Sequence, residues 1–115
     1  MPILAIDTAT MVSSVAVADE KRLLAELTVQ TRLTHSETLL PHIEKVLQLA
    51  GVEKAELTGV AVSLGPGSFT GLRIGLAAAK AISYGLSIPI FGLSKRSYTL
   101  SVGVNFRSSY GIFVL

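Results

Sequence analysis

Residues 59–75 read GVAVSLGPGSFTGLRIG, and this stretch decides the fold of the chain. The run 59–64 is apolar apart from Ser63, as expected of a strand that is covered on both faces. A glycine-rich turn then leads into an alanine-rich helix that reaches about Tyr84, where Gly85 is expected to close it. A strand that turns directly into a helix is the repeating unit of α/β folds with parallel strands.

The segments on either side complete an α/β pattern. Aliphatic or alternating runs predict four more strands, over residues 3–6, 12–18, 22–31 and 88–93. Apolar residues spaced by three and four predict an amphipathic helix over 36–50, which Gly51 ends. Thr34 and Glu37 fit a capping box at its start, whereas Pro41 would delay the helix or bend it.

These elements follow the order β-β-β-α-β-α-β. Strands that alternate with helices pair in parallel through right-handed crossovers, and the opening meander adds antiparallel strands. We therefore predict an α/β fold with a mixed five-stranded sheet, the ribonuclease-H-like half-domain of actin-like (ASKHA) ATPases, over residues 1–94. The tail 95–115 alternates apolar with small or polar residues, which predicts a strand or hairpin.

The composition favours a cytoplasmic protein in which either nearly every element is buried or some apolar surface is covered by a partner. Of its 115 residues, 50% are hydrophobic and only 16% are charged. No run of about 20 residues is apolar throughout, and no basic stretch precedes the first apolar run, so we expect neither a membrane span nor a signal peptide. Cysteine is absent, which excludes disulfides and thiolate metal sites. A net charge of +2 is too small for a surface that grips nucleic acid.

The glycine-rich turn is the strongest local feature. A loop between a strand and a helix can aim backbone N–H groups at a phosphate, and actin-like ATPases place an acidic loop after their first strand. The phosphate-loop-like residues are Asp7, Thr8, Gly65, Gly67 and Ser68. The alternative is a purely structural turn, in which Ser68 or Thr70 caps the helix and Asp7 caps its own turn. The pattern is neither a Walker loop nor a dinucleotide fingerprint.

The two histidines do not predict a metal site. His35 and His42 are seven residues apart on the expected helix, about 10 Å along its axis, so one ion cannot bind both. No Gly-x-Ser-x-Gly motif and no cysteine supplies a nucleophile. We therefore expect no metal and no catalytic residue.

Small residues recur every fourth position in the second helix, at Gly71, Gly75 and Ala79. Glycine inside a helix costs about 1 kcal/mol relative to alanine, so a close contact should offset it. That contact is either with the chain's own sheet or first helix, or with a helix of a second subunit. Arg73 follows Gly71 at the start of the helix, where a cation is unfavourable, and this predicts an anion or a carboxylate nearby.

Residues 65–75, GPGSFTGLRIG, match the hallmark segment of the bacterial TsaB (YeaZ-type) family. Residues 3–10 resemble the opening strand of that family, and residues 35–41 resemble the start of its first helix. The resemblance covers about residues 1–94. The family continues with a third helix and a second domain, whereas the tail 95–115 follows a different pattern, so we expect a truncated or altered form.

The resemblance implies a non-catalytic scaffold. TsaB proteins are related to TsaD, which transfers the threonylcarbamoyl group to adenosine 37 of tRNAs, and they bind and activate TsaD, with the ATPase TsaE also joining. The family dimerises, with itself or with TsaD, through two N-terminal helices. The interface residues implied here are His35, Leu40, Leu47, Gly71, Leu72, Gly75, Ala79 and Ile82.

The resemblance also implies that tRNA is reached only through the complex. It implies no cofactor of the chain's own, with ATP and magnesium bound only in the assembled complex, and no peptidase activity despite glycoprotease-like names in the wider family. The alternative is the nucleotide-binding lobe of an actin-like ATPase or kinase, with Asp7 and residues 65–68 around phosphate. A third interpretation is a fold fragment without activity.

Overall fold

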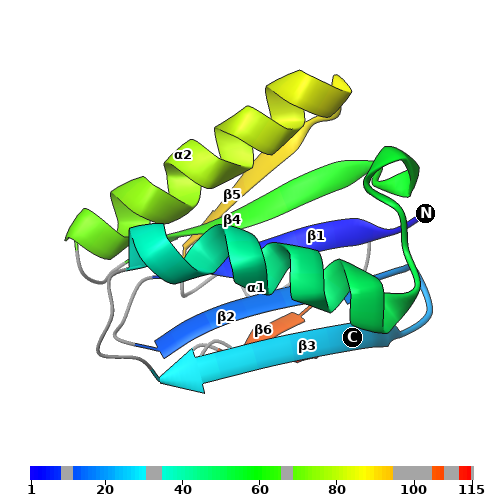
Figure 1. Ribbon diagram of the computed structural model, residues 1–115, viewed down its shortest axis with the longest axis horizontal. Coiled ribbons are helices and arrows are strands. Elements are labelled where there is room, and N and C mark those ends of the chain that lie inside the picture. Colours follow the sequence, from blue (N-terminus) through cyan, green and yellow to red (C-terminus); the bar gives the residue numbers. More distant parts are fainter. Residues whose placement is uncertain (9–11, 31–34, 66–68, 95–104, 108–111, 115) are drawn as a thin grey trace.

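The computed structural model describes residues 1–8, 12–30, 35–65, 69–94, 105–107 and 112–114. Its elements are β1 (Ile3–Asp7), β2 (Val12–Ala18), β3 (Leu23–Gln30), α1 (His35–Ala50), the short 3-10 helix η1 (Lys54–Glu56), β4 (Gly59–Gly65), α2 (Phe69–Leu86), β5 (Ile90–Ser94), β6 (Asn105–Arg107) and β7 (Ile112–Val114). Both long helices lie on one face of a five-stranded sheet (Figure 1). The predicted α/β fold with a mixed sheet is confirmed.

The strands of this sheet follow the order β3-β2-β1-β4-β5. β1, β4 and β5 run parallel, whereas β2 is antiparallel to both of its neighbours. β1 lies at the centre, where Ile6 pairs with Val15 of β2 on one side and with Val62 of β4 on the other. The central strand β1 therefore gains its second neighbour only when β4, the fourth strand of the chain, pairs with it.

The core fills the space between the sheet and the helices. Alternate residues of β1, β2 and β4 face the helices and are buried: Leu4, Ile6, Val15, Val17, Val60 and Val62. α1 covers them with Leu39, Ile43, Val46 and Leu47, whose spacing is that of one helix face. Burial of each such side chain stabilises the fold by about 1.5–3 kcal/mol, so this layer holds the helices on the sheet.

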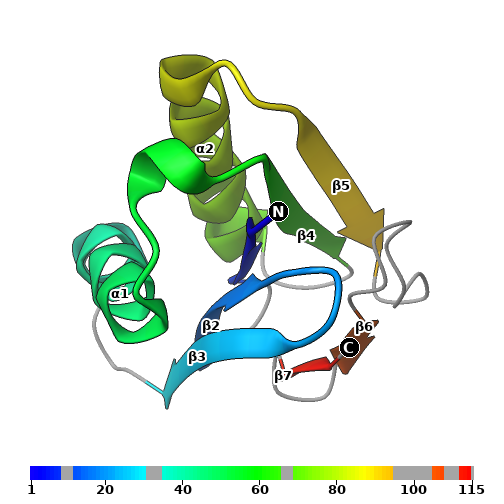
Figure 2. The same cartoon turned by 90° about the vertical axis from the view of Figure 1, so that its right-hand side faces the viewer.

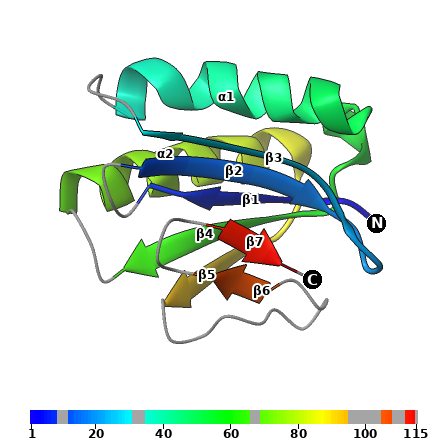
Figure 3. The same cartoon turned by 90° about the horizontal axis from the view of Figure 1, so that it is seen from below.

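The opposite face of the sheet carries mostly small side chains. Its buried residues are Ile3, Ala5, Ala16, Ala18 and Ala61. β6 and β7 pair antiparallel and lie on this side, away from the helices (Figure 2 and Figure 3). This ribbon occupies the part of the tail whose alternation predicts a strand or hairpin.

α1 runs from His35 through Pro41 to Ala50, so the proline does not delay the helix. The expected capping box involves side chains outside the described residues. Gly51, the predicted stop, has a φ of 69° and ends the helix in the left-handed conformation that glycine adopts without penalty. No helix among the described residues is long and apolar enough to span a membrane.

α2 ends two residues later than the sequence predicts. It continues through Gly85 to Leu86, and Ser87 takes the left-handed position with a φ of 55°. The N–H of Ile88 donates to the carbonyl of Ser83 at 3.0 Å, which is the longer hydrogen bond of a Schellman turn. This turn, and not the glycine, ends the helix, because it satisfies the last carbonyls of α2.

Ser87→Gly should raise the free energy of unfolding by about 1 kcal/mol, because glycine adopts the left-handed conformation without the clash of a Cβ. Urea denaturation followed by circular dichroism measures the change. Gly51→Ser is the reciprocal variant: it places serine in the same backbone conformation after α1 and should lower stability by a similar amount. Equal stability of Ser87→Gly and the unchanged chain would contradict the argument.

Candidate protein-binding groove between the helices

α1 and α2 enclose a groove of about 350 Å³ on the helical face of the molecule. Leu40, Ile43 and Leu47 line it from α1, and Ala81, Ile82 and Gly85 line it from α2. Leu4 of β1 and Leu57, both buried, lie at its floor. We call this feature the helix groove. Its lining is almost entirely apolar, which is the chemistry of a surface that another apolar surface can cover.

The α1 wall of the groove carries a large apolar side chain that is open to solvent. This residue, Leu40, is 57% exposed. Ala81 and Gly85 are small, so the backbone of α2 can be approached closely there. A helix laid along the groove would meet a large side chain on one wall and a shallow wall opposite.

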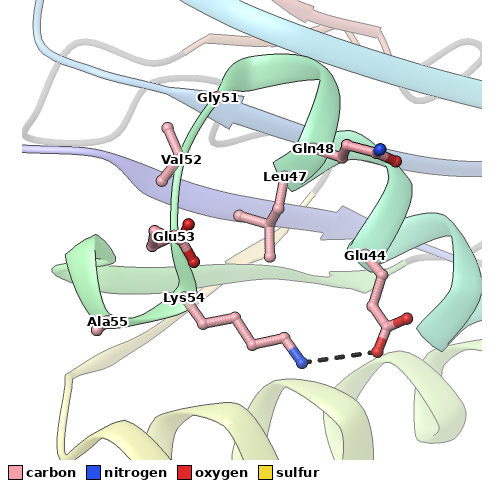
Figure 4. Close-up of a pocket in the computed structure, with 8 residues that line it drawn as sticks. All are labelled: Glu44, Leu47, Gln48, Gly51, Val52, Glu53, Lys54 and Ala55. Carbon is pink, nitrogen blue, oxygen red and sulfur yellow. Dashed lines mark ion pairs between the residues drawn. The ribbon is translucent and has the colours of Figure 1, made fainter.

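Charged groups stand at the rim of the groove. Lys54 Nζ lies 3.7 Å from Glu44 Oε1 and links η1 to α1 (Figure 4). Both side chains are more than half exposed, so the ion pair contributes less than about 1 kcal/mol and can be rearranged by a partner. An apolar floor with a charged rim is the general anatomy of protein interfaces.

A second hollow, of about 540 Å³, opens beyond the end of α1 (Figure 4). Glu44 and Lys54 belong to it as well, and Gln48, Gly51 and Glu53 complete its polar lining. Its charges are of both signs, so it has no strong preference for an anion or a cation. His42 is half-buried on α1, and among the described residues no three metal-ligating side chains gather.

The structure brings only part of the expected interface together. Leu40, Leu47 and Ile82 line the groove, although Leu47 is also a buried core residue. Leu72 lies half-buried on α2 outside the groove lining. His35 begins α1, and its side chain lies outside the described residues.

The row of small residues on α2 faces the chain's own sheet. Gly71, Gly75 and Ala79 are all buried. A Cβ on Gly75 would collide with the hydroxyl of Thr8 at the end of β1. Of the two contacts that the sequence left open for this row, Gly75 makes the one with the chain's own sheet, which allows α2 to lie close to β1.

Three of the phosphate-loop-like residues lie together at the carboxyl ends of two parallel strands. Asp7 and Gly65 end the parallel neighbours β1 and β4, and Thr8 follows directly. Thr8 Oγ1 donates a buried hydrogen bond of 2.6 Å to the carbonyl of Gly71, so its hydroxyl is used within the fold. Asp7 is buried as well. Gly67 and Ser68 lie outside the described residues.

Sequence reasoning missed several residues of the groove. Ala81 and Gly85 are a second pair of small residues four positions apart, so they share one side of α2. Of the small residues of this helix, the sequence-based prediction includes only the row at Gly71, Gly75 and Ala79. Leu57 and Lys54 come from the connection after α1, and no helical or strand period predicts where such a connection turns. The ion pair of Lys54 with Glu44 and the burial of Leu57 in the core bring this connection to the groove.

The chain was compared with known proteins. A family model described as TsaD: tRNA N6-adenosine threonylcarbamoyltransferase matches residues 22–103. Relatives named tRNA threonylcarbamoyladenosine biosynthesis protein TsaB occur in Buchnera aphidicola subsp. Schizaphis graminum (44% identity, 83% of this chain and 45% of the relative) and in Escherichia coli K12 (37%, 82% and 40%). The chain therefore spans less than half the length of these curated relatives.

Solved structures agree with this result. YeaZ from Pseudomonas aeruginosa has a TM-score of 0.74 and 33% identity, covering 81% of this chain and 42% of that one. A ROK hexokinase from Thermus thermophilus has a TM-score of 0.57 at 20% identity, covering 83% and 35%. The hexokinase shows the fold alone, and it confirms the ribonuclease-H-like half-domain.

Gly75→Ala should lower the free energy of unfolding by about 1–2 kcal/mol, because the added methyl collides with Thr8 Oγ1. In a Thr8→Ala chain the same change should be neutral or stabilising by up to about 1 kcal/mol. The remaining neighbours then lie at 3.6 Å, an ordinary contact, and alanine favours the helix. Denaturation of the four variants of this double-mutant cycle measures the coupling. Additivity within about 0.5 kcal/mol would show that the two residues do not constrain each other.

Proposed function

Because the chain belongs to the TsaD family and matches its TsaB (YeaZ-type) members, we propose that it is a non-catalytic scaffold that binds TsaD in the formation of threonylcarbamoyladenosine in tRNA. On this proposal, tRNA is bound by the complex and not by this chain. The protein acts in the cytoplasm, and TsaE joins the same assembly. The named relatives support the pathway, and the helix groove supports the scaffold role.

The helix groove is the observation that carries the proposal. It is an apolar hollow between two helices, and it leaves Leu40 more than half exposed. Helices of another protein can cover such a helix pair. Each Å² of apolar surface that is removed from water in this way stabilises the complex by about 25 cal/mol. Because the surface is the same on every copy, two copies can also cover one another in the absence of TsaD.

The polar groups at the carboxyl end of β1 support a non-catalytic role. The hydroxyl of Thr8 is committed to Gly71, and Asp7 is buried at the end of β1. Neither group lines the helix groove or the hollow beyond α1, as far as the described residues define them. We therefore propose that ATP and magnesium bind only in the assembled complex.

Leu40→Glu should weaken binding to the TsaD of the same organism by about tenfold or more, because it places a charge in the apolar wall of the groove. Leu49→Glu is the matched control. Leu49 is also 57% exposed on α1, and nine residues further along the helix it points about 180° away from Leu40.

Co-purification followed by titration calorimetry measures both variants, with circular dichroism to show that each is folded. Equal binding by Leu40→Glu and Leu49→Glu would contradict the groove as the binding surface. Failure of the unchanged, folded chain to bind TsaD would contradict the scaffold proposal itself.

A second titration separates the scaffold from the ATPase-lobe alternative. Magnesium ATP added to the chain alone should release no heat of binding at millimolar nucleotide, because Asp7 and Thr8 are buried. Saturable binding that is lost in Asp7→Asn would instead favour an actin-like nucleotide-binding lobe.

A further inference from the structure

β3 is an outer strand of the five-stranded sheet. Its inner edge pairs with β2, whereas its outer edge pairs with no strand among the described residues. β7 contacts β3 but is hydrogen-bonded in a different sheet. The eight residues of β3 therefore present N–H and C=O groups that can pair with a further strand.

The usual protections of an outer strand are weak in β3. It contains no proline, and Glu26 is its one charged residue. The irregularity of its pairing lies at its start, opposite Val17 and Ala18, and the residues after it pair regularly with β2. The regular part of the strand, residues 25–30, is thus free of the bulges that turn an edge away from partners.

The regular part of β3 is complementary to itself in an antiparallel pair. When a second copy is placed antiparallel about Leu27, Glu26 lies opposite Thr28 of the other copy, and Ala25 lies opposite Val29. Within the chain, Thr28 Oγ1 donates to Glu26 Oε1 at 2.7 Å and lies 3.0 Å from Ser14 Oγ, so in the dimer its one proton is shared between the Glu26 carboxylates of the two copies. No like charges face each other in this register, whereas a slip of two residues toward the strand's start would oppose the two Glu26 carboxylates.

We propose that two copies of this chain join along β3 in antiparallel pairing about Leu27, so that one sheet runs through both. The backbone hydrogen bonds provide the affinity, and the pairing of Glu26 with Thr28 selects the register. β3 contributes no residue to the helix groove, so this proposal is independent of the proposed function.

Disulfide trapping tests the register, because the chain contains no cysteine of its own. Leu27→Cys should form a disulfide-linked dimer on mild oxidation, since facing Cα atoms of an antiparallel pair are about 4.5–5.5 Å apart. Ala25→Cys and Val29→Cys should each remain unlinked alone, because their own copies lie about 13 Å away along the strand. A mixture of these two variants should form the linked dimer.

All variants are made in the Leu40→Glu chain, so that association through the helix groove does not contribute. Leu27 is half-buried, and the mixed pair at positions 25 and 29 provides the answer independently if Leu27→Cys folds poorly. Equal linkage of Val29→Cys alone, or no linkage in the mixture, would overturn the proposed register.

Light scattering tests the association itself. Thr28 is exposed, and both Thr28→Glu and Thr28→Gln lose the hydroxyl that donates to Glu26 of the same chain. Because Thr28→Glu also places a carboxylate beside that Glu26, circular dichroism first checks that each variant is folded. Thr28→Glu places a carboxylate opposite Glu26 of the other copy and should raise the dimer dissociation constant about tenfold or more relative to Thr28→Gln. Equal constants for the two variants, or a Leu40→Glu chain that stays monomeric at high concentration, would overturn the proposal.

Discussion

Gly75 of α2 lies directly over Thr8 at the end of β1, and no side chain larger than hydrogen fits between them. The hydroxyl of Thr8 uses this closeness to reach the carbonyl of Gly71. α2 is thereby held low over the central strand, where Ala79 is fully buried against the sheet. The cost of glycine inside a helix is offset by this packing, and the position of the second helix follows from it.

The groove depends on that position. With α2 held close to β1, the two helices flank a hollow that the buried residues Leu4 and Leu57 line from below. The buried contact between Gly75 and Thr8 therefore helps to shape the exposed helix groove. The small residues of α2 contribute to a partner's binding surface only through the position that they give the helix.

The strands and helices were predictable because each has a strong local pattern, such as the aliphatic run 59–64 and the spacing of Leu39, Ile43 and Val46. The end of α2 was not, because Ser87 adopts a conformation for which glycine is the usual signal. The row of small residues shows that something approaches α2 closely, but not from which side. The groove itself was beyond prediction, since Leu57 reaches it from a connection without periodicity.

The parallel pairing of β1 with β4 has a consequence for synthesis of the chain. Thr58, beside the start of β4, donates its hydroxyl to the carbonyl of Pro2, 56 residues earlier. At roughly 5–20 residues per second, the ribosome needs about 3–11 s to make that stretch. During this time β1, β2 and β3 can form a local meander, but one side of the central strand β1 remains open. The nascent chain therefore passes through a period in which its central strand is available to chaperones, or to other nascent chains, before its own partner emerges.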